Sequence, residues 1–225
     1  MAKIVDFSIF YDRACERKGG EQNMLAHMPT LASDDQLMQL TDDRVLSLLT
    51  RCIFRAGFVW QVIDNKWPQF EQAFSGFVPL YWQQVPPERL EALANDERIV
   101  RNFQKIITVP VNARMIVEVA EEHGSFGRFL AQWPEDDQVG LLLFLKKNGA
   151  RLGGNTSQYA LRMLGWDGFV TSPDVVRALA NYRLLDASVT SQKGLRQVQT
   201  AINHWHEKTG LPRSHISRIL SYSVG

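Results

Sequence analysis

The chain lacks the features that mark several protein classes. It has only two cysteines, Cys15 and Cys52, too few for the disulfide framework of a small secreted domain. Its longest apolar windows, at 106–111 and 140–145, fall far short of the roughly 20 residues that a transmembrane helix needs. The first residues lack the basic and then apolar segments of a signal peptide. These absences predict a cytoplasmic protein without a membrane segment.

An excess of charge of one sign is also missing. The sequence has 25 Lys and Arg residues against 24 Asp and Glu, a formal net charge of +1. No global field therefore attracts nucleic acid or membrane, and any anion-binding surface must be local. Because 45% of the 225 residues are hydrophobic, the composition excludes a disordered chain and allows a sizeable core. The length predicts one large domain or two intimate lobes.

Helical periodicity is the signal that the sequence does contain. Apolar residues at helical spacing, N-cap residues and prolines at helix starts all recur, whereas no strand-like alternation exceeds a few residues. We therefore predict an all-α protein with about ten helices. The expected helices cover 41–55, 67–74, 86–93, 96–123 with a bend or break at Pro110 and an end at Gly124, 135–147, 155–164, 172–179, 194–208 and 212–222.

The segment 145–156 is the most informative stretch for function. It combines a helix end, a turn with three glycines and the start of a new helix, for which we expect Asn155 or Thr156 as the N-cap. Outward-facing amides at such a helix start, with the helix dipole behind them, bind phosphate, and nearby basic side chains add local charge. The same pattern also fits an ordinary turn between two helices with solvated lysines. The candidate DNA-binding residues are Lys146, Lys147, Gly149, Arg151, Gly153, Gly154, Asn155 and Thr156.

Several further motifs, in order along the chain, resemble one known family. They are Ala56-Gly57-Phe58-Val59-Trp60, Asn65-Lys66-Trp67-Pro68 with Phe70, Ala73 and Phe74, Ile99-Val100-Arg101-Asn102, Lys105-Ile106 and Asn112-Ala113. Together they resemble the DNA-3-methyladenine glycosylase I family of the helix-hairpin-helix glycosylase superfamily, over roughly residues 5–180. The segment 145–156 falls where that family has its hairpin.

The resemblance implies a fold and an activity. The fold is a two-lobed, all-helical helix-hairpin-helix glycosylase. We expect residues 1–225 to form a single compact unit, with a core lobe at 41–180 and terminal helices from 1–40 and 181–225 packing on it. The implied enzyme is a monomer that flips 3-methyladenine out of double-stranded DNA containing alkylated bases and excises it hydrolytically, without a cofactor.

Aromatic residues are the main candidates for the base pocket. Methylation at N3 makes adenine cationic, and aromatic faces favour a cation over neutral adenine. Tyr11 and Trp60 match aromatic positions of the family's base site, and Phe10 is a weaker neighbour. Without the resemblance, a core role for Trp60 and an anchoring role for Tyr11 would be the favoured explanations of these residues.

The sequence departs from the family at acidic positions. Where the family has a glutamate that contacts the base, this chain has Cys52, whose thiol cannot replace a carboxylate as an acceptor. Where many superfamily members have a catalytic aspartate, it has Ser172, with Asp174 two residues later. Asp174 also suits the first turn of a helix. Other carboxylates that could orient water are Asp12, Glu16 and Glu21.

The family's zinc site does not carry over to this chain. Three of its ligand positions hold Cys15, Asp174 and Ala178, and we expect no structural zinc and no other metal.

Two alternative functions remain open at this point. One is a protein of the same fold that binds lesions without cutting. The other is a transcriptional regulator, because 209–220 resembles the turn and recognition helix of a helix-turn-helix, with Arg213, Ser214 and Arg218 able to reach base edges.

Overall fold

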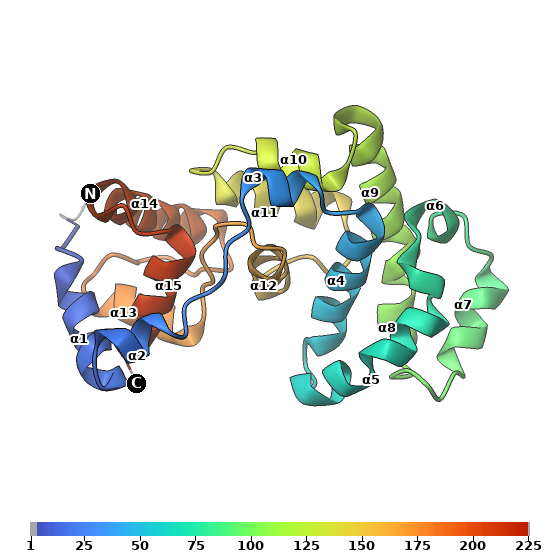
Figure 1. Cartoon of the computed structure of the whole chain (residues 1–225), viewed down its shortest axis with the longest axis horizontal. Helices are drawn as coiled ribbons and strands as arrows, with labels where there is room; N and C mark the ends of the chain where they lie inside the picture. The colour runs from blue at the N-terminus through green and yellow to red at the C-terminus, as the bar shows by residue number, and fades with distance from the viewer. Residues whose placement is uncertain (1–3, 225) are drawn as a thin grey trace. The chain divides into compact units, whose positions relative to one another are not determined.

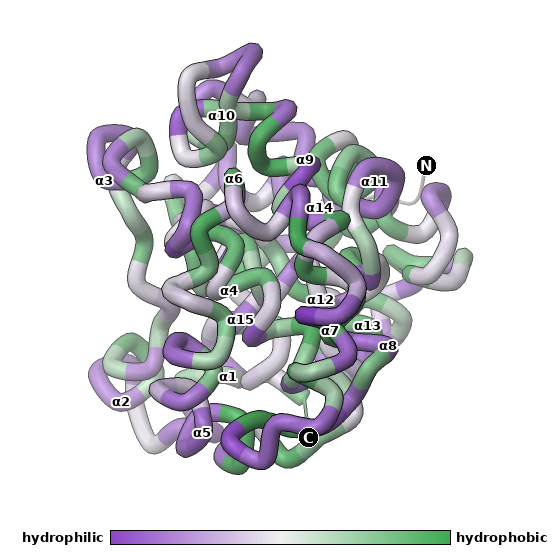
Figure 2. The backbone as a smooth tube through the Cα atoms, turned by 90° about the vertical axis from the view of Figure 1, so that its right-hand side faces the viewer, coloured by the Kyte–Doolittle hydropathy of each residue, from purple (hydrophilic) through white to green (hydrophobic). Residues whose placement is uncertain are grey.

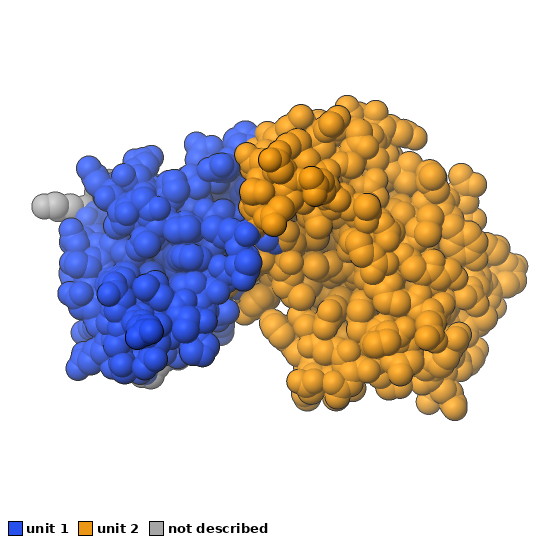
Figure 3. Space-filling view, viewed as in Figure 1, with its two compact units in different colours: residues 1–31, 134–141, 165–225 blue, residues 32–133, 142–164 orange. Residues whose placement is uncertain are grey.

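A computed structural model describes residues 4–224, and every regular element in that part of the chain is a helix. The predicted all-α class is therefore confirmed. Contacts divide the chain into two units, coloured separately in Figure 3. Unit 1 contains residues 4–31, 134–141 and 165–224, and unit 2 contains residues 32–133 and 142–164. Unit 1 thus combines residues 4–31 and 181–224 of the expected terminal segments with 134–141 and 165–180, whereas residues 32–40 lie in unit 2.

Unit 2 is built around α4 (Asp42–Arg55), which packs against α9 (Thr108–His123), α5 (Trp60–Ala73) and α12 (Asn155–Met163) (Figure 1). Hydrophobic and hydrophilic stretches alternate along these helices (Figure 2), as they do in amphipathic helices that bury one face. The shorter elements of the unit are α3 (Asp34–Met38), η1 (Ser75–Phe77), α6 (Pro79–Trp82), α7 (Pro87–Ala94), α8 (Phe103–Ile106) and α10 (Phe126–Gln132).

A column of aromatic rings forms much of this core. Trp67, Phe70, Phe74 and Phe77 stack with ring centroids 4.9–6.1 Å apart and interplanar angles of 13° or less. Their burial explains why α5 differs from our prediction. We expected a helix to start at Trp67–Pro68, but α5 starts seven residues earlier and Pro68 lies inside it. The packing of these rings offsets the backbone hydrogen bond that a proline removes from a helix interior.

The predicted long helix over 96–123 was wrong in its first part. Residues 96–102 are not helical, and α8 and α9 are separate helices. Pro110 lies in the first turn of α9, where its missing N–H costs no intrahelical bond, so the helix begins close to Pro110 instead of bending there. Gly124 ends α9 with a positive φ of 88°, as predicted.

Unit 1 contains the terminal helices. α15 (Arg213–Tyr222) packs against α1 (Ser8–Lys18), α13 (Pro173–Asn181) and α14 (Gln192–Thr209), while α2 (Glu21–Leu25) packs on α1. The chain passes between the units at residues 31/32, 133/134, 141/142 and 164/165, and the third of these points lies within α11 (Gln138–Asn148).

Candidate functional site

Unit 2 contains a cavity of about 130 Å³ where α4 ends, α5 begins and α12 passes. Between α4 and α5 the chain reverses over residues 56–59, and Gly57 supplies the positive φ of 77° that this turn requires. The lining residues are Cys52, Arg55, Ala56, Trp60, Asn155, Thr156, Tyr159 and Met163. The structure therefore brings together Trp60, Cys52 and the first residues of the predicted hairpin helix.

Trp60 is the most accessible aromatic residue of this cavity. Its exposure is 44%, so it is not the buried core tryptophan that the sequence also allowed. Its ring meets Tyr159 edge to face, with centroids 5.1 Å apart and an interplanar angle of 87°. The Arg55 guanidinium carbon lies 5.0 Å from the Trp60 ring centroid, within cation–π distance. The cavity thus presents an open aromatic surface with a cation beside it.

Arg55 is held in place by Asp64 of α5. Its Nε and Nη2 atoms donate to the two Asp64 carboxylate oxygens at 2.8 and 2.6 Å, and its Nη1 lies 3.0 Å from the Met163 sulfur. Arg51 also donates to Asp64, at 3.0 Å from Nε. Burial raises the pKa of Asp64, but the hydrogen bonds from the two arginines outweigh this and the pKa is lowered overall. Asp64 is therefore a carboxylate at neutral pH that fixes the direction of Arg55.

Cys52 is buried at 5% exposure, with its sulfur 3.7 Å from the Met163 sulfur. Burial raises the pKa of the Cys52 thiol to about 12, because the apolar surroundings disfavour a thiolate. At neutral pH this side chain is an uncharged small group. It can neither attack as a thiolate nor accept hydrogen bonds as the family's carboxylate would.

The hairpin segment is anchored to α9 by Asn112, which is fully buried. Its Oδ1 accepts from the Ala150 amide at 2.7 Å and its Nδ2 donates to the Ala150 carbonyl at 3.2 Å. A Cβ on Gly149 would lie only 3.0 Å from Asn112 Oδ1, so this glycine serves close packing. Lys146, Lys147 and Arg151 are exposed on this segment.

The N-cap of α12 is Gly154, not Asn155 or Thr156 as we expected. Its φ of 57° with ψ of −138° is a conformation that only glycine adopts readily. A glycine N-cap has no side chain with which to bond the amides of the first turn. This geometry suits an anion-binding helix start, and Asn155 and Thr156 of that turn also line the cavity.

Tyr11 lies in unit 1, where its hydroxyl donates a hydrogen bond to the Glu21 carboxylate. This bond raises the pKa of Tyr11 to about 12. Glu21 is therefore engaged in positioning Tyr11, while Asp12 and Glu16 are exposed.

Phe10 does not have the environment of a pocket residue. It is 1% exposed and packs edge-on against Tyr182 and Trp205, with centroids 4.9 and 5.3 Å apart. A ring enclosed in this aromatic cluster cannot contact a ligand, so Phe10 is a core residue of unit 1.

The other acidic and polar candidates of unit 1 have structural surroundings. Ser172 is the N-cap of α13 and its hydroxyl accepts from the Val175 amide at 3.4 Å, with Asp174 in the first turn. Ala178, at one of the family's zinc positions, has no ligating atom, and the structure holds no group of three or more His, Cys, Asp or Glu side chains in residues 4–224 that could bind a metal ion. The residues present therefore do not fit the family's zinc site.

The helix-turn-helix interpretation of 209–220 is not supported by the packing. Arg213 is 6% exposed and donates from Nε to Asn203 and from its amide to Asp167. Ser214 is fully buried. Neither side chain can reach a DNA base edge without unfolding α15.

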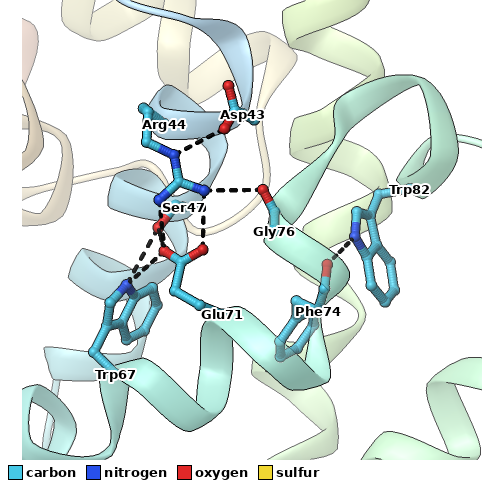
Figure 4. A network of polar contacts seen from close by, with 8 residues as sticks. All are labelled: Asp43, Arg44, Ser47, Trp67, Glu71, Phe74, Gly76 and Trp82. Carbon is cyan, nitrogen blue, oxygen red and sulfur yellow. Dashed lines mark hydrogen bonds and ion pairs between the residues drawn. The ribbon is translucent and has the colours of Figure 1, made fainter.

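A polar network joins α4 and α5, two of the three helices that line the cavity (Figure 4). Glu71 of α5 accepts two hydrogen bonds from Arg44 of α4, at 3.0 and 2.9 Å, and one from Trp67 Nε1 at 3.1 Å. Ser47 of α4 also donates to Glu71. Arg44 reaches the Gly76 carbonyl at 3.0 Å, which adds η1 to the network. Glu71 thus holds α5 against α4 through side chains that do not line the cavity.

Arg55, Tyr159 and Asn112 are the residues that sequence reasoning missed. Arg55 directly precedes the Ala56-Gly57 turn that carried the resemblance, and Asn112 was part of a quoted motif without a role. No motif marked Tyr159, and the contacts of all three residues depend on helices that are distant in the sequence.

Comparisons with known proteins agree with this fold. A family model described as methyladenine glycosylase matches residues 37–142. A crystal structure of 3-methyladenine DNA glycosylase I is 18% identical, with a TM-score of 0.50 over 64% of this chain and 86% of the other. A tyrosine-to-phenylalanine variant of such an enzyme, in complex with 3-methyladenine, is 19% identical with a TM-score of 0.50, over 64% and 83% of the two chains. A glutamate-to-glutamine variant from Staphylococcus aureus has the same identity and TM-score, over 68% and 90%. The family model covers just under half of this chain, and the solved structures share its fold, so the chain is similar to the methyladenine glycosylases.

Proposed function

We propose that the protein is a DNA glycosylase that flips 3-methyladenine, or a similar alkylated base, out of DNA and excises it hydrolytically, which initiates base-excision repair. The observation that carries the proposal is the exposed Trp60 ring in a cavity that also includes the first residues of the hairpin helix α12. An aromatic surface for an everted base thus lies beside a helix start suited to a phosphate.

The chemistry requires little from the protein. Methylation at N3 places a positive charge on the adenine, which weakens its bond to deoxyribose and makes the base a good leaving group. A damaged base is also cheaper to extrude from the stack than a sound one. Stacking on Trp60 and van der Waals contact with Tyr159 and Met163 would hold the everted base while water attacks the sugar.

The hairpin segment supplies the contact with the DNA backbone in this proposal. The amides at the start of α12 would bind a phosphate, and the exposed Lys146, Lys147 and Arg151 would add local positive charge. Such contacts position the enzyme without reading sequence, which suits a repair enzyme that must act at any site.

The proposed reaction requires DNA as the partner of this protein. We infer that it acts as a monomer on double-stranded DNA containing alkylated bases, in the cytoplasm. In the described residues, no helix combines the length and apolar character required to cross a bilayer.

A second candidate function is recognition of lesions without excision. It is favoured by Cys52, which stands where the family's carboxylate would be, since the lining of the cavity then contains no acidic side chain. A water-orienting role for Glu21, which bonds Tyr11 within unit 1, or for the exposed Asp12 stays a prediction from the resemblance.

The test is release of bases from methylated DNA, identified by mass. We expect the protein to release 3-methyladenine, and Trp60→Ala to reduce release at least about tenfold through loss of base stacking. Phe103→Ala is the matched control, because Phe103 is also 44% exposed in unit 2 but does not line the cavity. Preferential binding to methylated DNA without release would favour the lesion-binding function. Equal rates for the two variants would remove Trp60 from the site.

A further inference from the structure

The charge of the cavity is unusual for a site that receives a cationic base. Arg55 lines it, and its side chain is only 10% exposed. Arg55 and Arg51 share the single carboxylate of Asp64, which leaves the cluster with one uncompensated positive charge. No carboxylate lies in the cavity lining to balance it. A positively charged base in this cavity would therefore be repelled by Arg55.

The repulsion changes during the reaction that we propose. When the bond between the base nitrogen N9 and the sugar carbon C1′ breaks, both electrons go to the base. A cationic 3-methyladenine then becomes neutral, and the positive charge passes to the deoxyribose as an oxocarbenium-like centre. Water adds its oxygen to C1′ and releases a proton to solvent. A fixed cation beside the base thus disfavours the starting state more than the transition state, which lowers the barrier.

We propose that Arg55 is a catalytic residue that drives the bonding electrons onto the departing base, at the expense of tight substrate binding. This inference rests on the proposed glycosylase function. The geometry supports it in two ways. Asp64 holds the guanidinium through two hydrogen bonds, so that the charge is oriented before the base arrives. The burial of Arg55 limits screening by solvent, so that the net positive charge of the Arg51–Arg55–Asp64 cluster acts within the cavity.

The proposal also explains why a neutral group stands at Cys52. Positions 52 and 55 are three apart on α4, so side chains at these positions are neighbours on the helix surface. A carboxylate at position 52 would be a second acidic partner beside Asp64 and would cancel the net positive charge of the cluster. A thiol that stays protonated leaves that charge free to act on the base.

The test separates binding from chemistry by single-turnover excision of 3-methyladenine at several enzyme concentrations. We expect Arg55→Met to lower the rate at saturating enzyme by about tenfold, while the enzyme concentration for half-maximal rate stays equal or falls. Arg55→Lys, which keeps a positive charge, should recover part of the rate. Arg98→Met is the matched control, because Arg98 is also paired with an aspartate in unit 2 but does not line the cavity, and this variant should retain the wild-type rate.

Cys52→Glu gives an independent test that does not depend on removing Arg55. It restores the acidic residue type of the family, so a purely structural view predicts equal or faster excision. Our proposal predicts a rate at saturating enzyme at least about fivefold lower, because the new carboxylate neutralises Arg55. An unchanged saturating rate in Arg55→Met, or faster excision by Cys52→Glu, would overturn the role of Arg55. A wild-type protein that releases no base would instead refute the proposed function itself.

Discussion

Glu71 offers a direct test of how α4 and α5, two of the helices that line the cavity, are held together. Its carboxylate accepts hydrogen bonds from Arg44, Trp67 and Ser47 (Figure 4). Trp67 and Ser47 are buried at 8% and 5% exposure, so Glu71→Ala leaves two buried donors with one acceptor fewer. The Arg44 side chain is 47% exposed, so its ion pair with Glu71 adds little.

The expected loss follows from these contacts. A buried donor without its acceptor costs about 1–3 kcal/mol, and the Trp67 indole keeps a second acceptor in Ser47 at 3.2 Å. We therefore expect Glu71→Ala to lower the free energy of unfolding by about 2–4 kcal/mol, which corresponds to a drop in melting temperature of roughly 5–12 °C for a chain of this size. Glu71→Gln keeps an acceptor oxygen and should lose about half as much.

Urea unfolding followed by circular dichroism measures this loss. Glu118→Ala is the control, because Glu118 is an exposed carboxylate on α9 of the same unit. If Glu71→Ala and Glu118→Ala unfold within about 0.5 kcal/mol of each other, the network does not hold α5 against α4 and our reasoning is wrong.

Two further predictions concern the hairpin and unit 1. Gly153→Asp should weaken binding to damaged and undamaged DNA alike, because it places an anion beside the proposed phosphate site. Gly153→Ala is the control, since its Cβ would meet only Lys146, at 3.9 Å. Equal affinity of the two variants in a fluorescence binding assay would contradict the role of the hairpin. The Tyr11–Glu21 hydrogen bond raises the pKa of Tyr11 from 10.0 to about 12, so its stabilisation is fully present below pH 10 and is lost as the pH rises to about 12. The difference in urea midpoint between the wild type and Tyr11→Phe should therefore shrink across this range, and a constant difference would show that the bond does not contribute.

The sequence predicted those parts of the fold that depend on local signals. Helices α4, α7 and α15 begin and end within two residues of the prediction, because acidic first turns, prolines and apolar spacing specify their ends. The start of α5 was missed, because Pro68 is a strong local signal and the stacking that overrides it involves Phe77, beyond the helix. Short helices such as α3 and α10 have too few residues for a periodic pattern to be recognised.

The sequence identified those site residues that stand at motif positions of the family. Trp60 and Cys52 were identified because both occupy positions that the family uses, and the structure places both in one cavity. Phe10 was chosen as a neighbour of Tyr11 in sequence, but adjacent residues on a helix point in different directions and its ring enters the core. Arg55 and Tyr159 act through contacts between α4, α5 and α12, which no local pattern specifies.

The position of the flipped base tests the central claim most directly. A crystal structure of the protein bound to DNA that contains an uncleavable analogue of 3-methyladenine would locate it. Our account predicts the base outside the duplex, in van der Waals contact with the Trp60 ring and beside Arg55. A base that remains stacked in the duplex, or that lies away from Trp60 in a productive complex, would contradict it.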